Sequence, residues 1–297
     1  MTETLLNFVQ ISDIHLRAGL APTNWWLSAD PAALLRRAVE AVQRLPGVEF
    51  VLFTGDLLDR AEEAALDQFF EIVADLPCPY YVVAGNHDVA VEPGPGQLGK
   101  RALARRLGLP GRLFYSCALK NGYRLIALDS IPETAPRMQG VLSAEQQAWL
   151  GEELRIHREE VTIVALHHPP IVAAPGWDWR FRPADSLQLS EALAAAPNVA
   201  VLVNGHLHFP RFWRTGRRAH LSAPALGGPP NAIRPIQILR EAGQVYLRYD
   251  WLPVRPEGQT PLWYPLVTGG NCDRSGRIAL PLPALQFQDA PAGIPRL

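Results

Sequence analysis

The chain has 297 residues and a mass of 32.8 kDa, a length that suits either one α/β unit or two smaller domains. Hydrophobic residues make up 48% and charged residues 19%, which excludes a mainly disordered polar chain. The 28 Lys and Arg residues against 29 Asp and Glu residues give a net charge of −1, so no strong nucleic-acid footprint is expected.

From residue 5 to about residue 250, short apolar runs alternate with longer helical patterns, which is typical of a layered α/β fold. The first expected helix has Asp30 as its N-cap and Pro31 at its first position. Strands are expected at 5–11, 49–54, 80–84, 113–118, 123–129, 161–166 and 199–203. Helices are expected at 31–44, 62–75, 97–107, 143–157 and 185–196.

After residue 208 the helical patterns stop. Four consecutive short strands, joined by Gly, Pro and Asn turns, are expected to form an antiparallel sheet; they lie at 209–214, 218–223, 233–239 and 244–251. Residues 252–297 are rich in Pro and too irregular for a further βαβ unit, so they are predicted to be an extension of the unit formed by residues 1–251.

Polar side chains gather just after five of the predicted strands. The five segments are Ser12-Asp13-Ile14-His15, Gly55-Asp56-Leu57-Leu58-Asp59-Arg60, Gly85-Asn86-His87-Asp88, His167-His168-Pro169-Pro170 and Asn204-Gly205-His206-Leu207-His208. The carboxyl ends of parallel strands lie along one edge of a sheet, so these side chains are expected to meet in one crevice. Six of the eight histidines belong to these segments, and only His157 and His220 do not.

The residue types of this cluster favour metal binding. Asp, Asn and His supply oxygen and imidazole donors without thiolate, a set that suits Zn, Mn, Fe or Co. In Asp13-x-His15 and His206-x-His208, two donors lie on the same side of an extended segment. One ion would not use so many ligands, so a pair of ions about 3.5 to 4 Å apart fits better.

The ordered motifs DxH, GDxxD, GNHD, HHPP and GHLH resemble the calcineurin-like metallophosphoesterase superfamily, and within it the bacterial cyclic-nucleotide and glycerophosphodiester phosphodiesterases. The resemblance spans residues 12 to 208. It implies an α/β fold of four layers, an αββα sandwich of two mixed β-sheets flanked by helices. It also makes residues 1–251 the phosphoesterase domain, with 252–297 as a C-terminal extension that packs on the core or at an interface.

The resemblance assigns the ligands of two divalent or trivalent metal ions, drawn from Mn, Fe, Zn and Co. It implies that the first ion is held by Asp13, His15 and His208, the second by Asn86, His167 and His206, and that Asp56 bridges both. A carboxylate can bridge two cations through its oxygens, whereas neutral imidazole and amide groups complete the two shells. The adjacent His168 is left with a supporting or structural role.

A hydroxide bridging the two ions is the expected nucleophile, because metal coordination brings the pKa of water towards neutrality. His87 matches the non-ligand histidine of the family and Asp59 the carboxylate that orients it. His87 is therefore expected to stabilise the phosphate or to protonate the leaving oxygen. The alternative for Asp59 is a helix cap. Arg60 resembles an Arg that grips substrate phosphate in protein Ser/Thr phosphatases, although Ala61 replaces the Gly that follows it there.

Two loops are long enough to overhang the crevice, 16–29 with Trp25 and 171–184 with Trp177. Their aromatic rings are expected to bind substrate or else to pack beneath their own loops. The leading hypothesis is hydrolysis of a small phosphodiester. The resemblance makes a 3′,5′-cyclic nucleotide the first candidate, with a glycerophosphodiester or a 2′,3′-cyclic nucleotide close behind. The alternatives are a phosphomonoesterase or a pyrophosphatase acting on a nucleoside diphosphate or a lipid-linked substrate, and a non-catalytic scaffold. The presence of all seven ligands disfavours the scaffold.

No apolar stretch approaches the roughly 18 to 20 residues of a membrane span, and the first residues lack the basic region of a signal peptide. A cytoplasmic location is therefore expected. The three scattered cysteines predict neither a disulfide framework nor a thiolate metal site. The resemblance adds a homodimer as one expected assembly.

Overall fold

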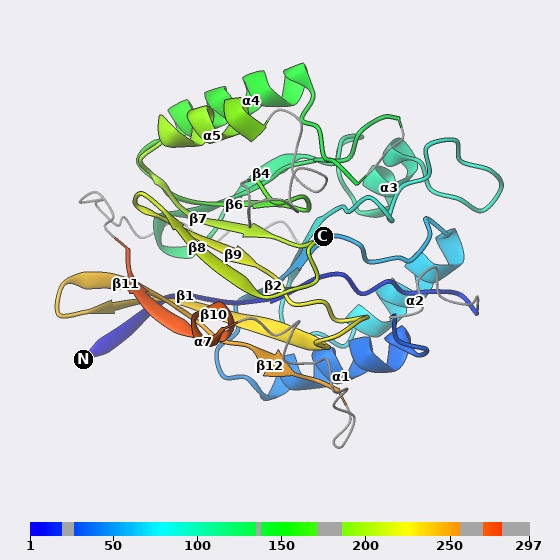
Figure 1. Cartoon of the computed structure of the whole chain (residues 1–297), viewed down its shortest axis with the longest axis horizontal. Coiled ribbons are helices and arrows are strands. Elements are labelled where there is room, and N and C mark those ends of the chain that lie inside the picture. Colours follow the sequence, from blue (N-terminus) through cyan, green and yellow to red (C-terminus); the bar gives the residue numbers. More distant parts are fainter. Residues whose placement is uncertain (20–26, 135–137, 171–185, 256–269, 281–297) are drawn as a thin grey trace.

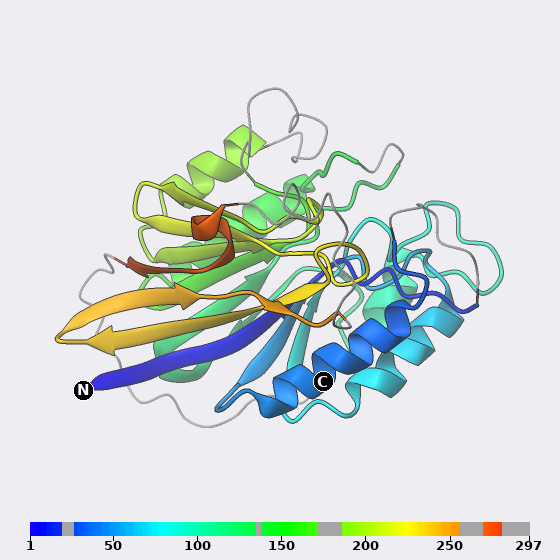
Figure 2. The same cartoon turned by 60° about the horizontal axis from the view of Figure 1, so that its bottom comes forward.

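Two β-sheets stack face to face, and helices cover the outer face of each (Figure 1). The computed structural model describes residues 1–19, 27–134, 138–170, 186–255 and 270–280. Helices α1 (Pro31–Arg44) and α2 (Glu63–Val73) cover the first sheet, and α4 (Ala144–Ile156) and α5 (Ser186–Ala194) cover the second, as Figures 1 and 2 show. The predicted four-layer αββα sandwich of two mixed sheets is confirmed.

The first sheet has the strand order β13-β11-β10-β1-β2-β3, and β12 pairs with β10 at its side. Its strands are β1 (Thr2–Ile11), β2 (Phe50–Thr54), β3 (Tyr80–Val83), β10 (Ala232–Glu241), β11 (Gln244–Tyr249), β12 (Leu252–Pro253) and β13 (Gly276–Ala279). Strands β1, β2 and β3 run parallel, whereas β1 and β10 are antiparallel, with Thr2 opposite Glu241. The N-terminal strand is therefore central in its sheet.

The second sheet has the order β4-β5-β6-β7-β9-β8. Its strands are β4 (Tyr115–Ala118), β5 (Tyr123–Ala127), β6 (Val161–Leu166), β7 (Val199–Asn204), β8 (Arg211–Thr215) and β9 (Arg218–Ser222). The four inner strands are parallel and the two edge strands are antiparallel to them. The remaining described elements are α3 (Lys100–Arg106), the 3₁₀ turn η1 (Lys120–Gly122) and α7 (Asn271–Arg274).

The prediction that the four strands after residue 208 form one antiparallel sheet is wrong. Strands β8 and β9 form a hairpin in the second sheet, where β9 runs parallel to β7, whereas β10 and β11 form a hairpin in the first sheet. Local turn signals identify the hairpins correctly, but the partner of each hairpin lies far away in the sequence. Two segments beyond residue 251, β12 and β13, also pair with strands of the first sheet.

Three apolar clusters fill the spaces between the four layers. Along β2, Phe50 and Leu52 face the second sheet, while Val51 and Phe53 face the helices, because successive side chains of a strand point to opposite faces. Both faces of the inner strands are thus buried, which explains their continuous apolar runs. The third cluster lies between the second sheet and helices α4 and α5.

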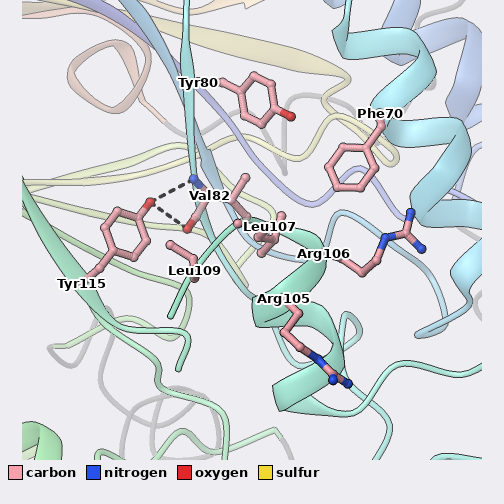
Figure 3. Close-up of a pocket in the computed structure, with 9 residues that line it drawn as sticks. Phe70, Tyr80, Val82, Arg105, Arg106, Leu107, Leu109 and Tyr115 are labelled. Atoms are coloured by element: carbon pink, nitrogen blue, oxygen red, sulfur yellow. Dashed lines mark hydrogen bonds between the residues drawn. The ribbon is translucent and has the colours of Figure 1, made fainter. Parts of the chain in front are cut away.

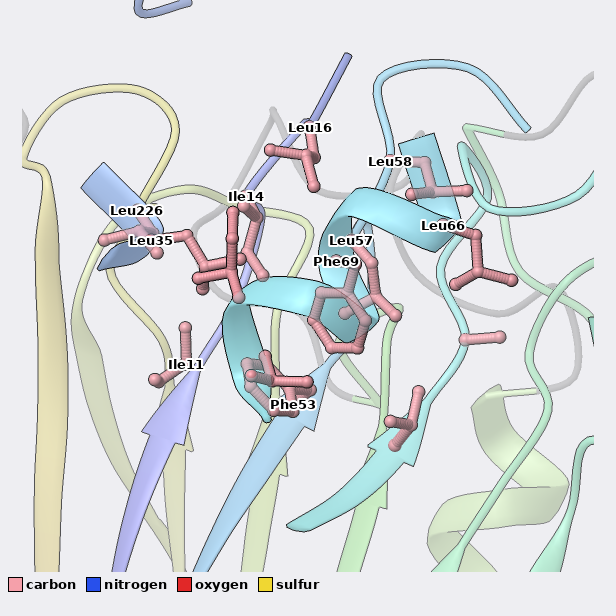
Figure 4. Close-up of a cluster of buried hydrophobic side chains, with 14 of the residues drawn as sticks. Ile11, Ile14, Leu16, Leu35, Phe53, Leu57, Leu58, Leu66, Phe69 and Leu226 are labelled. Atoms are coloured by element: carbon pink, nitrogen blue, oxygen red, sulfur yellow. The ribbon is translucent and has the colours of Figure 1, made fainter. Parts of the chain in front are cut away.

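The core also anchors the loops that carry the predicted ligands. Ile14 separates Asp13 from His15, and Leu57 and Leu58 separate Asp56 from Asp59; the three apolar side chains are fully buried beneath α1 and α2 (Figure 4). Each polar residue of these loops is therefore fixed by an apolar neighbour that packs in the opposite direction.

The edge strands β3 and β4 of the two sheets meet at a hydroxyl group. The Tyr115 Oη atom accepts a hydrogen bond from the Val82 N–H at 3.1 Å and donates one to the Val82 carbonyl at 3.0 Å (Figure 3). Both backbone groups of Val82 that face away from β2 are thus satisfied, which protects this sheet edge from pairing with another chain. Beside it, Phe70, Tyr80 and Arg106 line a pocket.

Among the described residues, no helix is both long enough and apolar enough to cross a membrane.

Candidate metal centre

Five loops meet where β1, β2 and β3 of the first sheet and β6 and β7 of the second sheet end. Backbone hydrogen bonds tie neighbouring loops together: Asp13 N donates to Gly55 O at 3.0 Å, and Gly205 N donates to His167 O at 3.1 Å. The first bond joins two loops of the first sheet, and the second joins two loops of the second sheet. The structure therefore brings all seven sequence-predicted ligand residues to one end of the sandwich.

The first donor set consists of Asp13, His15, Asp56 and His208, each of which offers one atom within 4.8 Å of the others. His208 Nε2 lies 3.2 Å from Asp13 Oδ1 and 3.4 Å from His15 Nε2. His15 Nε2 lies 3.8 Å from Asp56 Oδ2. Two carboxylates and two imidazoles thus converge on one point.

The second donor set consists of Asp56, His167 and His206, with Asn86 beside them. His167 Nε2 lies 3.2 Å from Asp56 Oδ2, 3.1 Å from Asn86 Oδ1 and 3.2 Å from His206 Nδ1. Asp56 Oδ2 therefore lies within 4 Å of an imidazole of each set, and Asp56 is the only residue common to the two groups.

The backbone is strained at most of these positions. Eight non-glycine residues have a positive φ in the part of the chain that the structure describes, and five of them are predicted ligands: Asp13 (53°), His15 (52°), Asp56 (51°), His206 (66°) and His208 (63°). Such conformations cost about 1–3 kcal/mol each and persist where the surroundings enforce them, often at functional sites.

Two motif glycines allow the strained loops to approach one another. At Gly205 a Cβ atom would lie 2.2 Å from Ser12 Oγ and 2.7 Å from Thr54 O, and at Gly55 it would lie 2.4 Å from His167 Nδ1. Any larger residue at these positions would push the ligand loops apart.

Hydrogen bonds to main-chain carbonyls orient two of the ligand rings. His167 Nδ1 donates to Thr54 O at 2.8 Å, which leaves Nε2 directed at Asp56. His206 uses the opposite nitrogen: Nε2 donates to Met138 O at 3.1 Å, which leaves Nδ1 directed at His167. A carbonyl that fixes the second ring nitrogen in this way is the usual support of a metal-bound histidine.

Burial and charge set the protonation of the cluster. Burial lowers the pKa of His15 to about 3 and the pKa of His206 well below its ordinary value, so both rings are neutral. Burial also disfavours the charged form of His167, but the Asp56 carboxylate outweighs it and raises the pKa of His167 to about 9. Facing histidines lower the pKa of Asp13 and of Asp56 despite their burial.

These features fit metal ions. Ring nitrogens approach one another at 3.2 and 3.4 Å, and the buried Asp13 Oδ2 has no hydrogen-bond partner among the described residues. Buried polar atoms normally have a hydrogen-bond partner. Nitrogen and oxygen atoms that face one another with too few protons to form hydrogen bonds therefore favour a cation between them. A bound cation would also replace the proton on His167.

His87 lies beside both donor sets. Its main-chain N–H donates to Asp56 Oδ1 at 2.9 Å, and its ring Nδ1 lies 2.8 Å from the main-chain carbonyl of Asp59. The sequence predicted that the Asp59 carboxylate orients His87, whereas here the Asp59 carbonyl does so, and Asp59 Oδ1 lies 3.7 Å from His15 Nδ1. His15, Asp59 and His87 form a third group of donors within 4.8 Å.

Asp88 ties two of the loops together. Its fully buried carboxylate accepts hydrogen bonds from Leu58 N at 2.9 Å and from Gly85 N at 2.7 Å. It thereby links the loop of Asp56 to the loop of Asn86.

The sequence predicted three substrate contacts, Arg60, Trp25 and Trp177. Arg60 is half-buried and directly follows Asp59. Trp25 and Trp177 lie outside the described residues.

Sequence reasoning missed several supporting groups. Ser130 Oγ lies 2.8 Å from His168 Nδ1, and the His168 ring lies 4.4 Å from the His206 ring. Neither Ser130 nor the carbonyl of Met138 belongs to a motif. A main-chain contact leaves no signal in the residue types of a single sequence. The only available signal was His168, the second histidine of the HHPP segment, which lies beside both Ser130 and His206.

Comparison with solved structures defines the class of the fold. A dimetal phosphatase from Danio rerio superposes with a TM-score of 0.71 at 15% identity, and the match covers 94% of this chain and 100% of the other. The two mixed sheets, the outer helices and the His/Asp centre at the strand ends together define a metallophosphoesterase fold.

The family model for calcineurin-like phosphoesterases matches residues 6–210, and the chain belongs to this family. It is a hydrolase that acts on phosphoesters. A "cAMP/cGMP dual specificity phosphodiesterase" from Mycobacterium tuberculosis is 32% identical, and the match covers 68% of this chain and 61% of the relative. A "3′,5′-cyclic adenosine monophosphate phosphodiesterase" from Escherichia coli is 27% identical, with 69% and 70% covered.

Proposed function

We propose that this protein hydrolyses a small phosphodiester with the help of two metal ions, and that a 3′,5′-cyclic nucleotide is the first candidate substrate. The observation that carries this proposal is the sharing of Asp56 Oδ2 by two histidine-rich donor sets, at 3.8 Å from His15 Nε2 and 3.2 Å from His167 Nε2. A carboxylate that faces both donor sets could bind two neighbouring metal ions at once.

Similarity to named relatives supports the choice of substrate. The relatives from M. tuberculosis and E. coli are named for cyclic nucleotides. A relative from Arcobacter nitrofigilis, 28% identical with 67% of this chain and 71% of the relative covered, is named a "probable glycerophosphodiester phosphodiesterase". A glycerophosphodiester is therefore the second substrate to test.

In this proposal one ion would be held by Asp13, His15 and His208, the other by Asn86, His167 and His206, and Asp56 would contribute to both. Bound there, the ions would activate a water molecule for attack on phosphorus and would neutralise charge on the phosphate oxygens. The Asp59 carbonyl accepts a hydrogen bond from Nδ1–H of His87, so the imidazole presents Nε2 to the substrate. Protonated at Nε2, His87 donates a proton to the leaving oxygen. Arg60 contacts the phosphate.

The proposal is tested with purified protein that is stripped of metal and reloaded with Mn²⁺, Co²⁺, Zn²⁺ or Fe²⁺. Release of nitrophenol from bis(p-nitrophenyl) phosphate should require the metal. It should fall about a thousandfold or more in Asp56→Asn, because metal ions supply several kcal/mol of transition-state stabilisation. His157→Gln alters a histidine outside the five loops and should retain activity.

A substrate panel then separates the alternatives. Cyclic AMP, glycerophosphocholine, p-nitrophenyl phosphate and a nucleoside diphosphate are compared on the same preparation. Preference for cyclic AMP supports the proposal, whereas preference for p-nitrophenyl phosphate or for the diphosphate would replace it with a phosphomonoesterase or a pyrophosphatase. Activity that survives complete metal removal contradicts the metal mechanism.

A further inference from the structure

Four buried polar side chains lie close to the metal centre, on strands of both sheets. They are Gln10 of β1, Thr54 of β2, Asn204 of β7 and His220 of β9, none of which exposes any surface. Gln10 and Thr54 face the space between the two sheets, which is otherwise filled by apolar side chains. Asn204 and His220 face the outer side of the second sheet, because successive side chains of a strand alternate and their neighbours Val203 and Leu221 point inward. Buried polar groups in such surroundings must be paired to be tolerated, so their pairing reveals what they hold in place.

His220 holds the side chain of Asn204. His220 Nε2 lies 2.7 Å from Asn204 Oδ1, and Asn204 Nδ2 donates to Gly205 O at 2.6 Å. The second bond fixes the orientation of the amide, since the reverse orientation would place two oxygens in contact. The His220 ring therefore donates through Nε2–H. Burial lowers the pKa of His220 to about 3, so the ring is neutral.

The main chain of Asn204 joins this pair to the first sheet. Asn204 O accepts a hydrogen bond from Gln10 Nε2 at 3.0 Å, and the same nitrogen lies 3.1 Å from Thr54 Oγ1. Thr54 O in turn accepts the hydrogen bond from Nδ1 of the predicted ligand His167. The polar contacts thus run from His220 on β9, through the main chain of Asn204, to Thr54 on β2 and end on a histidine of the metal centre.

We propose that Asn204 and His220 are positioning residues of the metal centre, which hold the Gly205 carbonyl and, through it, the turn that presents His206 to one donor set and His208 to the other. This inference rests on the proposed role of these two histidines as ligands.

The geometry of the turn explains why it needs an anchor. His206 and His208 have φ values of 66° and 63°, which are unfavourable for residues with side chains. The turn is fixed on its other sides by Gly205 N to His167 O at 3.1 Å and by His206 N to Asp13 Oδ1 at 3.0 Å. The Asn204 amide supplies a further contact to Gly205, and the hydrogen bond from His220 holds that amide in place.

A matched pair of variants tests the Nε2 bond. In His220→Gln the amide nitrogen occupies the place of Nε2 and can donate to Asn204, whereas in His220→Asn the amide is one methylene shorter and cannot reach it. We expect His220→Asn to bind Mn²⁺ and Co²⁺ about 10 to 100 times more weakly at both positions, the usual effect of losing a support of a metal ligand. His220→Gln should remain within about threefold of the unmodified protein.

Metal binding is measured by equilibrium dialysis in metal buffers and by the visible spectrum of bound Co²⁺, and the fold is checked by circular dichroism. His157→Asn changes the other histidine outside the motifs and should leave both affinities unchanged. His220→Phe fills the space that Asn vacates but lacks the donor, so it should show the same loss as His220→Asn.

Unchanged Co²⁺ affinity and spectrum in His220→Asn and His220→Phe would overturn the inference. An equal loss in His220→Gln would also overturn it, because packing and not the hydrogen bond would then be responsible. If both donor-lacking variants fail to fold, the bond serves folding and the positioning role is wrong. If the unmodified protein does not bind two ions, the proposed function itself fails, which is a separate outcome.

Discussion

His87 and Asn86 are neighbours in sequence, yet the structure gives them different surroundings. The Asn86 side-chain oxygen lies 3.1 Å from His167 Nε2, among the ligands of the second set. The His87 ring stands edge-on to His15, at 4.8 Å between ring centres. Its Nδ1 atom is hydrogen-bonded to the Asp59 carbonyl. In the proposed function, Asn86 binds metal and His87 reaches the substrate.

His87→Gln should therefore keep both metal ions and lose turnover. The loss should be about 100-fold or more for alkyl leaving groups and smaller for p-nitrophenolate, which departs without a proton. The measurement is metal content together with rates over a series of leaving groups. A variant that has lost one ion would instead make His87 a ligand of the third group, with His15 and Asp59.

His220 also predicts a pH effect on stability. Its folded pKa of about 3 lies below the ordinary value of 6.5, so the unfolded chain binds the proton more readily than the folded one. Stability is thus complete above pH 6.5 and declines as the pH falls towards 3. Between pH 7 and pH 5 this single group should cost about 2 kcal/mol of unfolding free energy.

The comparison is urea unfolding of the metal-free protein and of His220→Gln, which has no titrating ring, at pH 7 and at pH 5. The metal-free protein should lose about 2 kcal/mol more than the variant over this interval. Equal losses would show that His220 is accessible to protons in the fold.

At the residue level, the sequence predicted those residues of the site that belong to recognisable motifs. The seven predicted ligand residues follow strands in a recognisable order, and the structure brings all of them together. The supports could not be predicted in the same way. His206 is supported by the main-chain carbonyl of Met138, a group that any residue type could supply. His220 lies on a strand that carries no motif, and its hydrogen-bond partner Asn204 is 16 positions away in the sequence.

Among the secondary-structure elements, the two helices that cover the first sheet begin differently. At the start of α1, Asp30 Oδ1 accepts a hydrogen bond from Ala33 N at 2.9 Å, and Pro31 is the first helical residue. At the start of α2, Glu62 makes no side-chain cap. A cap satisfies one of the backbone N–H groups that the first turn leaves unpaired.

Asp30→Ala should lower the free energy of unfolding by about 1 kcal/mol, while Asp30→Asn should cost little. Glu62→Ala, at the equivalent position of α2, is the matched control and should be close to neutral. Chemical denaturation of the three variants measures the difference. Equal effects at the two positions would mean that the Asp30 hydrogen bond adds no stability.

Helix and strand positions were largely predictable, because periodicity and caps are local. For example, α1 begins and ends at the predicted residues, 31 and 44. The assignment of strands to sheets was not predictable in this way. Hairpins β8–β9 and β10–β11 have similar turn signals, yet the first joins β7 and the second joins β1. That choice depends on contacts between distant segments, which local patterns do not encode.

For the whole molecule, a net charge of −1 conceals an uneven distribution. Two divalent ions would bring four positive charges against the two carboxylates Asp13 and Asp56 of their donor sets. A protein that is nearly neutral overall would then hold a concentrated positive centre for phosphate.

Metal removal should therefore lower thermal stability. An ion that binds only the folded state adds about 2.7 kcal/mol at 100 times its Kd, and about 2–4 °C of Tm accompanies each kcal/mol in a protein of this size class. We expect chelation to lower Tm by about 5 °C or more, and Asp56→Asn to show little further change on chelation. Scanning calorimetry with and without chelator checks both. An unchanged Tm would contradict metal binding to the folded state.

The central position of β1 has a consequence for synthesis. Its neighbours are β2, which ends at Thr54, and β10, which ends at Glu241. A nascent chain can pair one side of β1 early, but the other side stays open until nearly two hundred further residues have been added. Pairing between such distant segments is slow, and an unpaired strand edge invites association with other chains. Strand β1 is made before both of its neighbours, yet its pairing is complete only after β10 has been made.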